Sequence, residues 1–146
     1  MAGFTGVTGV SNFTRRQLNV MAGGGTFILM QEVQNGPVFC RHQLSTDTSS
    51  VETRELSITK VVDFTSKFLR AGVRRYIGRQ NINKVFLDSV ATTLTGMLQF
   101  LVENGILNGF FINNIIQDEA SPDTVYVDVT LDVPFPCNYI KLTLVV

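Results

Sequence analysis

The clearest pattern in the sequence is an alternation of apolar and polar residues between Thr124 and Val133. The apolar positions of this alternation fall on one side: Val125, Val127, Val129, Leu131 and Val133. Side chains of a strand point alternately to its two faces, so the pattern predicts a half-buried strand. Pro134 and Pro136 end it. A last strand is predicted after them, over Tyr139, Ile140, Lys141, Leu142, Thr143, Leu144, Val145 and Val146.

Two longer segments repeat their apolar residues with the period of a helix. The first is predicted to run from about Thr59 to Ile77, and Gly78 closes it. Its basic residues fall together on the side opposite the apolar arc: Lys60, Lys67, Arg70 and Arg74. The second helix is expected to begin after a cap at Asn81 or Asn83 and to reach about Glu103.

Shorter elements are predicted on either side of these helices. The pattern indicates a helix over Thr14–Met21 with a cap at Ser11 or Asn12, and a strand over Ile106–Gln117. Asn35-Gly36 is a strong hairpin signal between strands at Phe27–Gln34 and Val38–Leu44. A polar loop follows, in which Ser49 and Glu52 could form a capping box.

Together these elements predict one α+β domain over residues 1–146. Two long helices pack on a mixed or antiparallel sheet, with extended arms at residues 1–10 and 139–146. Hydrophobic residues make up 45% of the chain and charged residues 16%, which excludes a disordered chain. We expect no membrane-spanning segment. A surface with so few charges leaves apolar area for a partner to cover.

The charge distribution is more informative than the total, which is zero. Residues 60–84 hold seven basic groups and one acidic group, whereas residues 85–146 hold seven acidic groups and one basic group. This split suits contacts between copies of the chain as readily as binding to nucleic acid.

Catalytic and metal-binding patterns are weak. Cys40 and His42 share a strand face, but no third group is evident to orient a thiol–imidazole pair. Gly23-Gly24-Gly25 follows a helix and leads into a strand, the reverse of a phosphate-binding loop. Two cysteines and one histidine without suitable spacing do not predict a zinc site. We therefore expect no cofactor, no metal and no enzymatic activity.

The order of several segments resembles the C-terminal domain of contractile-tail sheath proteins, found in contractile phage tails and related injection machines. The matching pieces cover nearly the whole chain, and no single one is diagnostic: Asn19–Met30, Gly36–Asp47, Ile58–Phe64, Tyr76–Asn81, Val125–Val133, the Pro134–Pro136 break and Tyr139–Val146. Members of that family are usually several times longer, with variable domains inserted before this region. The resemblance is therefore to a minimal sheath or to a piece of a longer one.

The resemblance implies a structural function. Sheath subunits form a helical stack of hexameric rings around a tail tube, and their contraction drives the tube through the host envelope. Arms from neighbouring subunits add strands to each subunit's sheet. Here the implied exchange residues are the strand from Tyr139 to Val146 and the pairing residues Val125, Val127 and Val129. The implied partners are other copies, the tube, the baseplate and the tail terminator, in a virion assembled in the bacterial cytoplasm.

Three other functions stay open at this point. The first is another phage tail protein, such as a tube or terminator subunit. The second is a small nucleic-acid-binding module that uses the basic stripe Lys60, Lys67, Arg70 and Arg74, which the lack of aromatic residues interleaved with the stripe disfavours. The third is a thiol enzyme that uses Cys40 and His42.

Overall fold

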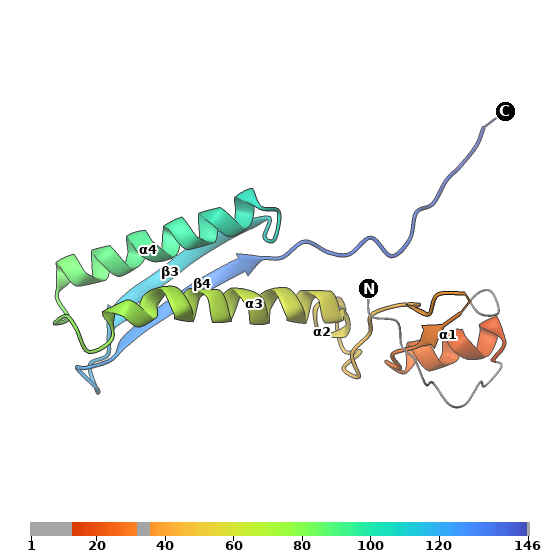
Figure 1. Cartoon of the computed structure of the whole chain (residues 1–146), viewed down its shortest axis with the longest axis horizontal. Helices are drawn as coiled ribbons and strands as arrows, with labels where there is room; N and C mark the ends of the chain where they lie inside the picture. The colour runs from red at the N-terminus through yellow and green to blue at the C-terminus, as the bar shows by residue number, and fades with distance from the viewer. Residues whose placement is uncertain (1–12, 32–35, 146) are drawn as a thin grey trace. The chain divides into compact units, whose positions relative to one another are not determined.

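The computed structural model of the chain describes residues 13–31 and 36–145 (Figure 1). The chain divides into two compact units, one of residues 1–59 and 136–146 and the other of residues 60–135. The described residues form an α+β fold, as the sequence predicts, and contain two separate antiparallel two-stranded sheets where a single sheet was expected. The predicted arm at residues 1–10, the predicted caps Ser11 and Asn12, and Val146 lie outside the described residues.

The first unit begins with a short helix and a small hairpin. Helix α1 spans Arg15–Gly23, and its cap is Thr14, whose hydroxyl accepts from the Gln17 amide while the Gln17 side chain accepts from Thr14. Strands β1 (Leu29–Met30) and β2 (Phe39–Cys40) pair antiparallel, with Leu29 opposite Cys40. The predicted antiparallel pairing is thus present, although its ladder is shorter than the predicted strands, and Asn35 of the predicted Asn35-Gly36 turn lies outside the described residues.

Gly25 shows why a glycine stands between α1 and β1. Its φ is +77°, in the left-handed region that other residues rarely adopt. A Cβ at this position would lie 2.5 Å from the carbonyl oxygen of Ser45, so the two chain segments can approach only at a glycine.

Two helices follow the polar loop. Helix α2 spans Val51–Arg54 and begins with a capping box between Ser50 and Thr53, one residue later than the predicted pair Ser49 and Glu52. Helix α3 spans Leu56–Val73 and continues into the 3₁₀ turn η1, Arg74–Tyr76. It therefore starts three residues earlier than the predicted Thr59.

The second unit contains the longest helix and the longer hairpin (Figure 1). Helix α4 spans Lys84–Glu103 and is capped by Asn83, whose side chain accepts from the Phe86 amide. Gly105, at φ +68°, lets the chain reverse after α4. Strands β3 (Gly109–Gln117) and β4 (Val125–Asp132) then pair antiparallel.

The core of the second unit lies where α4 meets this hairpin. Leu98, Leu101 and Leu107 are at most 2% exposed. Side chains from α3, β3 and β4 pack around them: Val61, Phe68, Leu69, Phe110, Ile112, Val129 and Leu131. A register shift at Asn113 keeps Ile112 opposite Val129 and Ile115 opposite Val127, so the apolar face continues past the irregularity.

The last segment differs from its prediction. From Pro136 to Val145 the chain has neither helix nor strand, so the strand predicted from Tyr139 is not formed in the described part. The physical reason is the absence of a partner: a strand requires a neighbour for its backbone N–H and C=O groups, and no described strand pairs with this segment.

By length and composition α4 could also cross a membrane. Core helices pass the same test, and α4 has the polar face of one, with Thr92, Thr95 and Gln99 exposed. Its buried residues Val90, Leu94, Leu98 and Leu101 occur at intervals of three and four, which is one helical stripe.

The core assignment predicts a large difference between two positions of α4. Leu98→Ala should lower the free energy of unfolding by about 2–5 kcal/mol, because it leaves a cavity in a fully buried site. The matched control, Val85→Ala, removes a side chain that is 74% exposed, and it should change stability by about 0.5 kcal/mol or less. Urea denaturation of both variants measures this, and equal losses would contradict the assignment.

Candidate functional site

The most unusual group in the first unit is the carboxylate of Glu55, which is only 1% exposed. Glu55 follows α2 in extended conformation and forms an isolated antiparallel bridge with Leu44. Hydrogen bonds from the Ser45 amide to Arg54 and from the Leu56 amide to Gln43 flank the bridge. The backbone thus fixes Glu55 beside the segment that follows β2.

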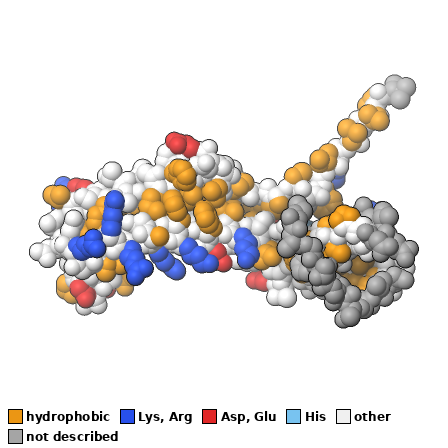
Figure 2. Space-filling model, in the orientation of Figure 1, with side chains coloured by type: hydrophobic (Ala, Val, Ile, Leu, Met, Phe, Trp, Pro, Cys, Tyr) orange, Lys and Arg blue, Asp and Glu red, His pale blue; other side chains and the backbone are white. Residues whose placement is uncertain are grey.

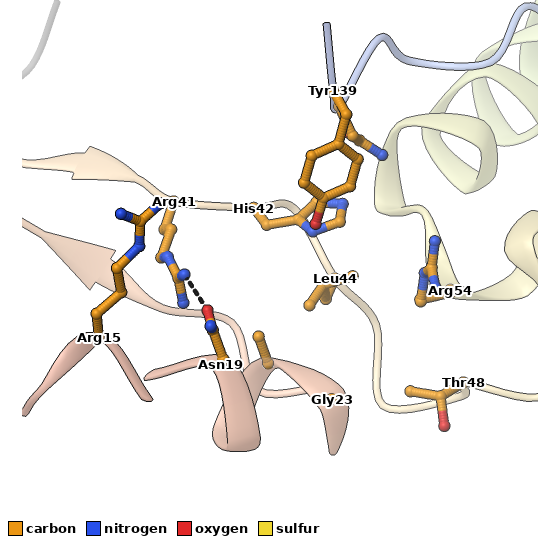
Figure 3. A pocket seen from close by; sticks show the side chains of 11 residues that line it. Arg15, Asn19, Gly23, Arg41, His42, Leu44, Thr48, Arg54 and Tyr139 are labelled. Carbon is orange, nitrogen blue, oxygen red and sulfur yellow. Dashed lines mark hydrogen bonds between the residues drawn. The ribbon is translucent and has the colours of Figure 1, made fainter. Parts of the chain in front are cut away.

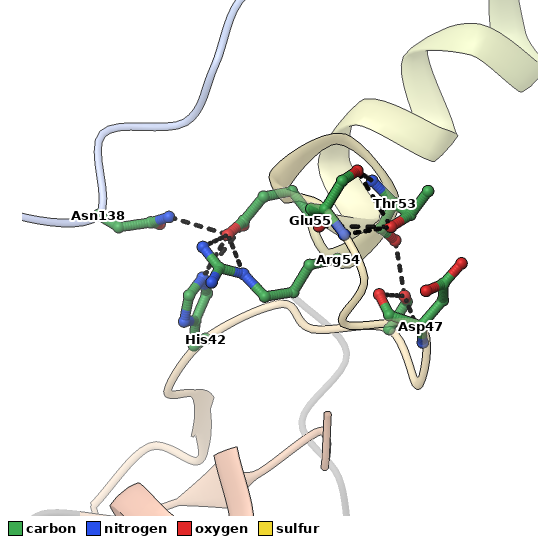
Figure 4. A network of polar contacts seen from close by, with 8 residues as sticks. His42, Asp47, Thr53, Arg54, Glu55 and Asn138 are labelled. Carbon is green, nitrogen blue, oxygen red and sulfur yellow. Dashed lines mark hydrogen bonds and ion pairs between the residues drawn. The ribbon is translucent and has the colours of Figure 1, made fainter. Parts of the chain in front are cut away.

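Three side chains from separate parts of the sequence donate to this carboxylate (Figure 4). His42 Nε2 lies 3.0 Å from both carboxylate oxygens. Arg54 Nη2 lies 3.2 Å and Asn138 Nδ2 3.1 Å from Oε1. Burying a carboxylate is unfavourable unless it is paired and hydrogen-bonded, and here both conditions are met. We call these four residues the Glu55 cluster.

The Glu55 cluster also fixes the start of the C-terminal segment. Asn138 is 83 positions from Glu55 in the sequence and belongs to the otherwise irregular stretch from Pro136 to Val145. The bond between the two side chains therefore holds this stretch immediately before the exposed apolar residues that begin at Tyr139.

Two exposed carboxylates order the loop and helix beside the cluster. The Ser49 hydroxyl, 2.6 Å from Asp47 Oδ1, is the main reason that the pKa of Asp47 is lowered, and the Ser49 amide adds to the effect. A hydrogen bond from the Ser50 side chain is the main reason that the pKa of Glu52 is lowered. Both groups help to fix the start of α2.

The structure uses His42 differently from the thiol–imidazole hypothesis. Its Nε2 faces Glu55, and no hydrogen bond joins it to Cys40 among the described residues. Cys40 is partly buried and Cys137 exposed, and both are free thiols. Nor do three or more Cys, His, Asp or Glu side chains gather as a metal site in the part of the chain that is described.

The apolar residues of the implied exchange segment are almost fully exposed. Tyr139, Ile140, Leu142, Leu144 and Val145 are each more than 80% exposed. Lys141 and Thr143, which lie between them, are also exposed. Five large apolar side chains in seven residues are thus left in water.

The implied pairing residues lie on β4. Val129 packs on the core of the second unit and Val125 is partly buried, whereas Val127 is 41% exposed. Their hairpin has only two strands, and no described strand pairs with the outer edge of either β3 or β4. Unpaired edges of this kind can receive a further strand.

The basic stripe forms a row of exposed side chains along α3 and its 3₁₀ turn (Figure 2). Lys60, Lys67, Arg70 and Arg74 form no ion pair with any described residue. The row ends at a hollow of about 540 Å³ whose lining includes Arg74, Arg75 and Arg79. Helix α3 therefore presents a net positive charge at its surface, with Asp63 as its one acidic residue.

A tyrosine holds the end of this row against α4. The Tyr76 hydroxyl lies 2.7 Å from Thr93 Oγ1, and its ring packs edge-on against Phe86. The hydrogen bond with Thr93 is the main cause of a lowered pKa of Tyr76, and Arg75 beside it adds to the shift.

The sequence reasoning did not find the Glu55 cluster. Glu55 occurs in a polar run, between Arg54 and Leu56, and nothing in its spacing marks it as buried. Nothing in the sequence around His42 or Asn138 identifies Glu55 as their shared partner.

The comparisons with known proteins assign no family. No family model matches the chain, and no curated protein matches it significantly.

The Glu55 cluster predicts a stability loss that is linked to motion of the C-terminal segment. Glu55→Ala removes the shared acceptor of three donors and should lower the free energy of unfolding by about 2–4 kcal/mol. Glu119→Gln changes an exposed carboxylate to which the described structure gives no hydrogen bond or ion pair, so it is the matched control and should cost about 0.5 kcal/mol or less.

A second readout tests the attachment itself. In Glu55→Ala and in Asn138→Ala, NMR relaxation should show larger nanosecond motions for the backbone of residues 136–140. Unchanged relaxation in both variants would show that the bond to Asn138 does not hold the segment.

Proposed function

We propose that this chain is a structural subunit of a contractile tail sheath, which polymerises helically around a tail tube. The observation that carries the proposal is the exposure of Tyr139, Ile140, Leu142, Leu144 and Val145 in one irregular segment. The order of motifs that resembles sheath proteins supports it independently.

The energetics of this segment favour a partner. Covering one large apolar side chain is worth roughly 1.5–3 kcal/mol, whereas ordering one residue costs about 1–2 kcal/mol. The free energy gained by burying alternate side chains thus only offsets the conformational entropy that is lost when the segment is ordered. Firm docking requires further contributions, from a ladder of backbone hydrogen bonds and from packing of the second face. A neighbouring copy can supply both.

The hairpin of β3 and β4 is the proposed receiver. A two-stranded hairpin is marginally stable alone, and both of its outer edges are unpaired within the described residues. A strand from a neighbouring copy would extend the sheet by strand addition, with main-chain bonds giving affinity and alternate side chains giving specificity. Because donor and receiver surfaces differ, such contacts are head-to-tail, and they build a ring or an open helix rather than a two-fold dimer.

The basic stripe on α3 and its 3₁₀ turn is the proposed contact with the tube or with the acidic residues 85–146 of a neighbouring copy. Its members are exposed and form no ion pair with described residues, so an acidic surface could approach them. The same charges would also attract nucleic acid, which is the second candidate function.

The remaining parts of the proposal rest on the resemblance. The subunits would form stacked hexameric rings in the tail of a virion, between a baseplate and a tail terminator. Contraction would drive the tube through the host envelope. The function is mechanical, so the proposal includes no catalysis and no cofactor.

The first test changes only the apolar face of the C-terminal segment. Ile140→Lys with Leu144→Lys should abolish polymerisation while the fold is kept, because a charged face cannot be buried on a neighbour's sheet. The matched control Thr143→Lys alters a residue between them and should assemble much more readily. Sedimentation velocity and negative-stain microscopy measure this. Normal tubes from the double variant would contradict strand exchange.

The second test reverses the charge of the basic stripe. The triple variant carries Lys67→Glu, Arg70→Glu and Arg74→Glu. If these residues contact the tube, the variant should no longer co-sediment with the tail tube protein. If they contact a neighbouring copy, the variant should polymerise less. Lys84→Glu, which changes an exposed residue outside the row, should have little effect. Tight DNA binding that falls steeply with salt and is lost in the triple variant would instead favour the nucleic-acid module.

A further inference from the structure

The first unit contains a cavity of about 640 Å³ that the proposed function does not use (Figure 3). Helix α1 contributes Arg15 and Asn19 to its lining, and the segment after β2 contributes Arg41 and His42. Thr48, Arg54, Asn138 and Tyr139 complete its polar lining. The cavity is therefore lined mainly by hydrogen-bond donors.

The charges around the cavity do not balance. Three guanidinium groups, those of Arg15, Arg41 and Arg54, line it. The nearby carboxylate of Glu55 accepts from Arg54 and from His42, so these two donors are already engaged. Neither Arg15 nor Arg41 forms an ion pair with a described residue. Two positive charges thus remain at the end of the cavity beside α1.

Arg41 is only partly satisfied. Its Nη2 donates to Asn19 Oδ1 on α1, which orients the guanidinium (Figure 3). Its Nη1 is shielded from solvent and has no hydrogen-bond partner among the described residues. A shielded, unpaired donor of a charged group is costly, and an anion bound in the cavity would remove that cost.

The chemistry of the ligand follows from these donors. Guanidinium groups bind carboxylate and phosphate through paired hydrogen bonds, with charge assistance. The cavity is many times larger than one water molecule, whose share of liquid volume is about 30 Å³. It can therefore hold a larger molecule that presents such a group. The carbonyl end of α1, at Ala22 and Gly23, lines the same cavity and would place the anionic group nearer Arg15 and Arg41.

We propose that the cavity lined by Arg15 and Arg41 is an anion-binding site for a ligand that presents a carboxylate or phosphate group. Two sources can supply this group. One is a free oxoanion. The other is an acidic segment of a second copy, such as the turn with Asp118, Glu119 and Asp123, which no cation between residues 85 and 140 compensates.

The experiment titrates the full chain with inorganic phosphate, with citrate, and with a peptide of residues 117–125. Isothermal titration calorimetry gives affinities, and NMR shift changes at Asn19, Arg41 and Thr48 locate binding. Arg15→Gln with Arg41→Gln should weaken binding tenfold or more. The control Arg16→Gln changes an exposed arginine of α1 that does not line the cavity, and it should bind like the parent chain.

Each outcome decides the inference. Binding of phosphate or citrate that the double variant loses supports a free oxoanion as the ligand. Tighter binding of the peptide supports a second copy, provided that a peptide with Asn, Gln and Asn at its acidic positions does not bind. The inference is overturned if no probe binds, or if the double variant binds as well as the control. A chain that binds a probe without forming polymers would contradict the sheath proposal and leave this inference intact.

Discussion

The constraint on which this account depends is a segment that no part of the described chain covers. Five of the seven residues from Tyr139 to Val145 are large and apolar, and each is more than 80% exposed. Their backbone groups have no strand partner among the described residues. In the proposed assembly, joining the sheet of another copy would meet both demands, apolar burial and backbone pairing. The unpaired edges of β3 and β4 could receive such a strand, and the proposal that the chain polymerises depends on this match.

The Glu55 cluster gives this segment a defined starting point. A buried carboxylate with donors at 3.0–3.2 Å holds Asn138, immediately before the exposed apolar residues that begin at Tyr139. In a polymer whose subunits remain linked through strands, such an attachment would carry force from the exchanged strand to the body of the subunit.

Sequence patterns predicted the parts of the fold whose periodicity is local. Asn83 and the 3.6-residue repeat identified α4, and the alternation around Val129 identified β4, because one buried face is sufficient to specify each element. The last strand could not be predicted correctly for the isolated chain, since strand formation depends on a partner outside the segment. The Glu55 cluster was not found because its members, such as His42 and Asn138, meet only through tertiary structure. The orphaned donor of Arg41 depends on the same unpredicted packing.

The most direct test of strand exchange is a helical cryo-EM reconstruction of the assembled protein at a resolution that traces the backbone. The account predicts that residues 139–145 form a strand in the polymer and pair with the β3–β4 hairpin of a different copy. It also predicts that Asn138 remains hydrogen-bonded to Glu55 of its own chain. A reconstruction in which this segment pairs with its own hairpin, or projects unpaired into solvent, would contradict the central claim.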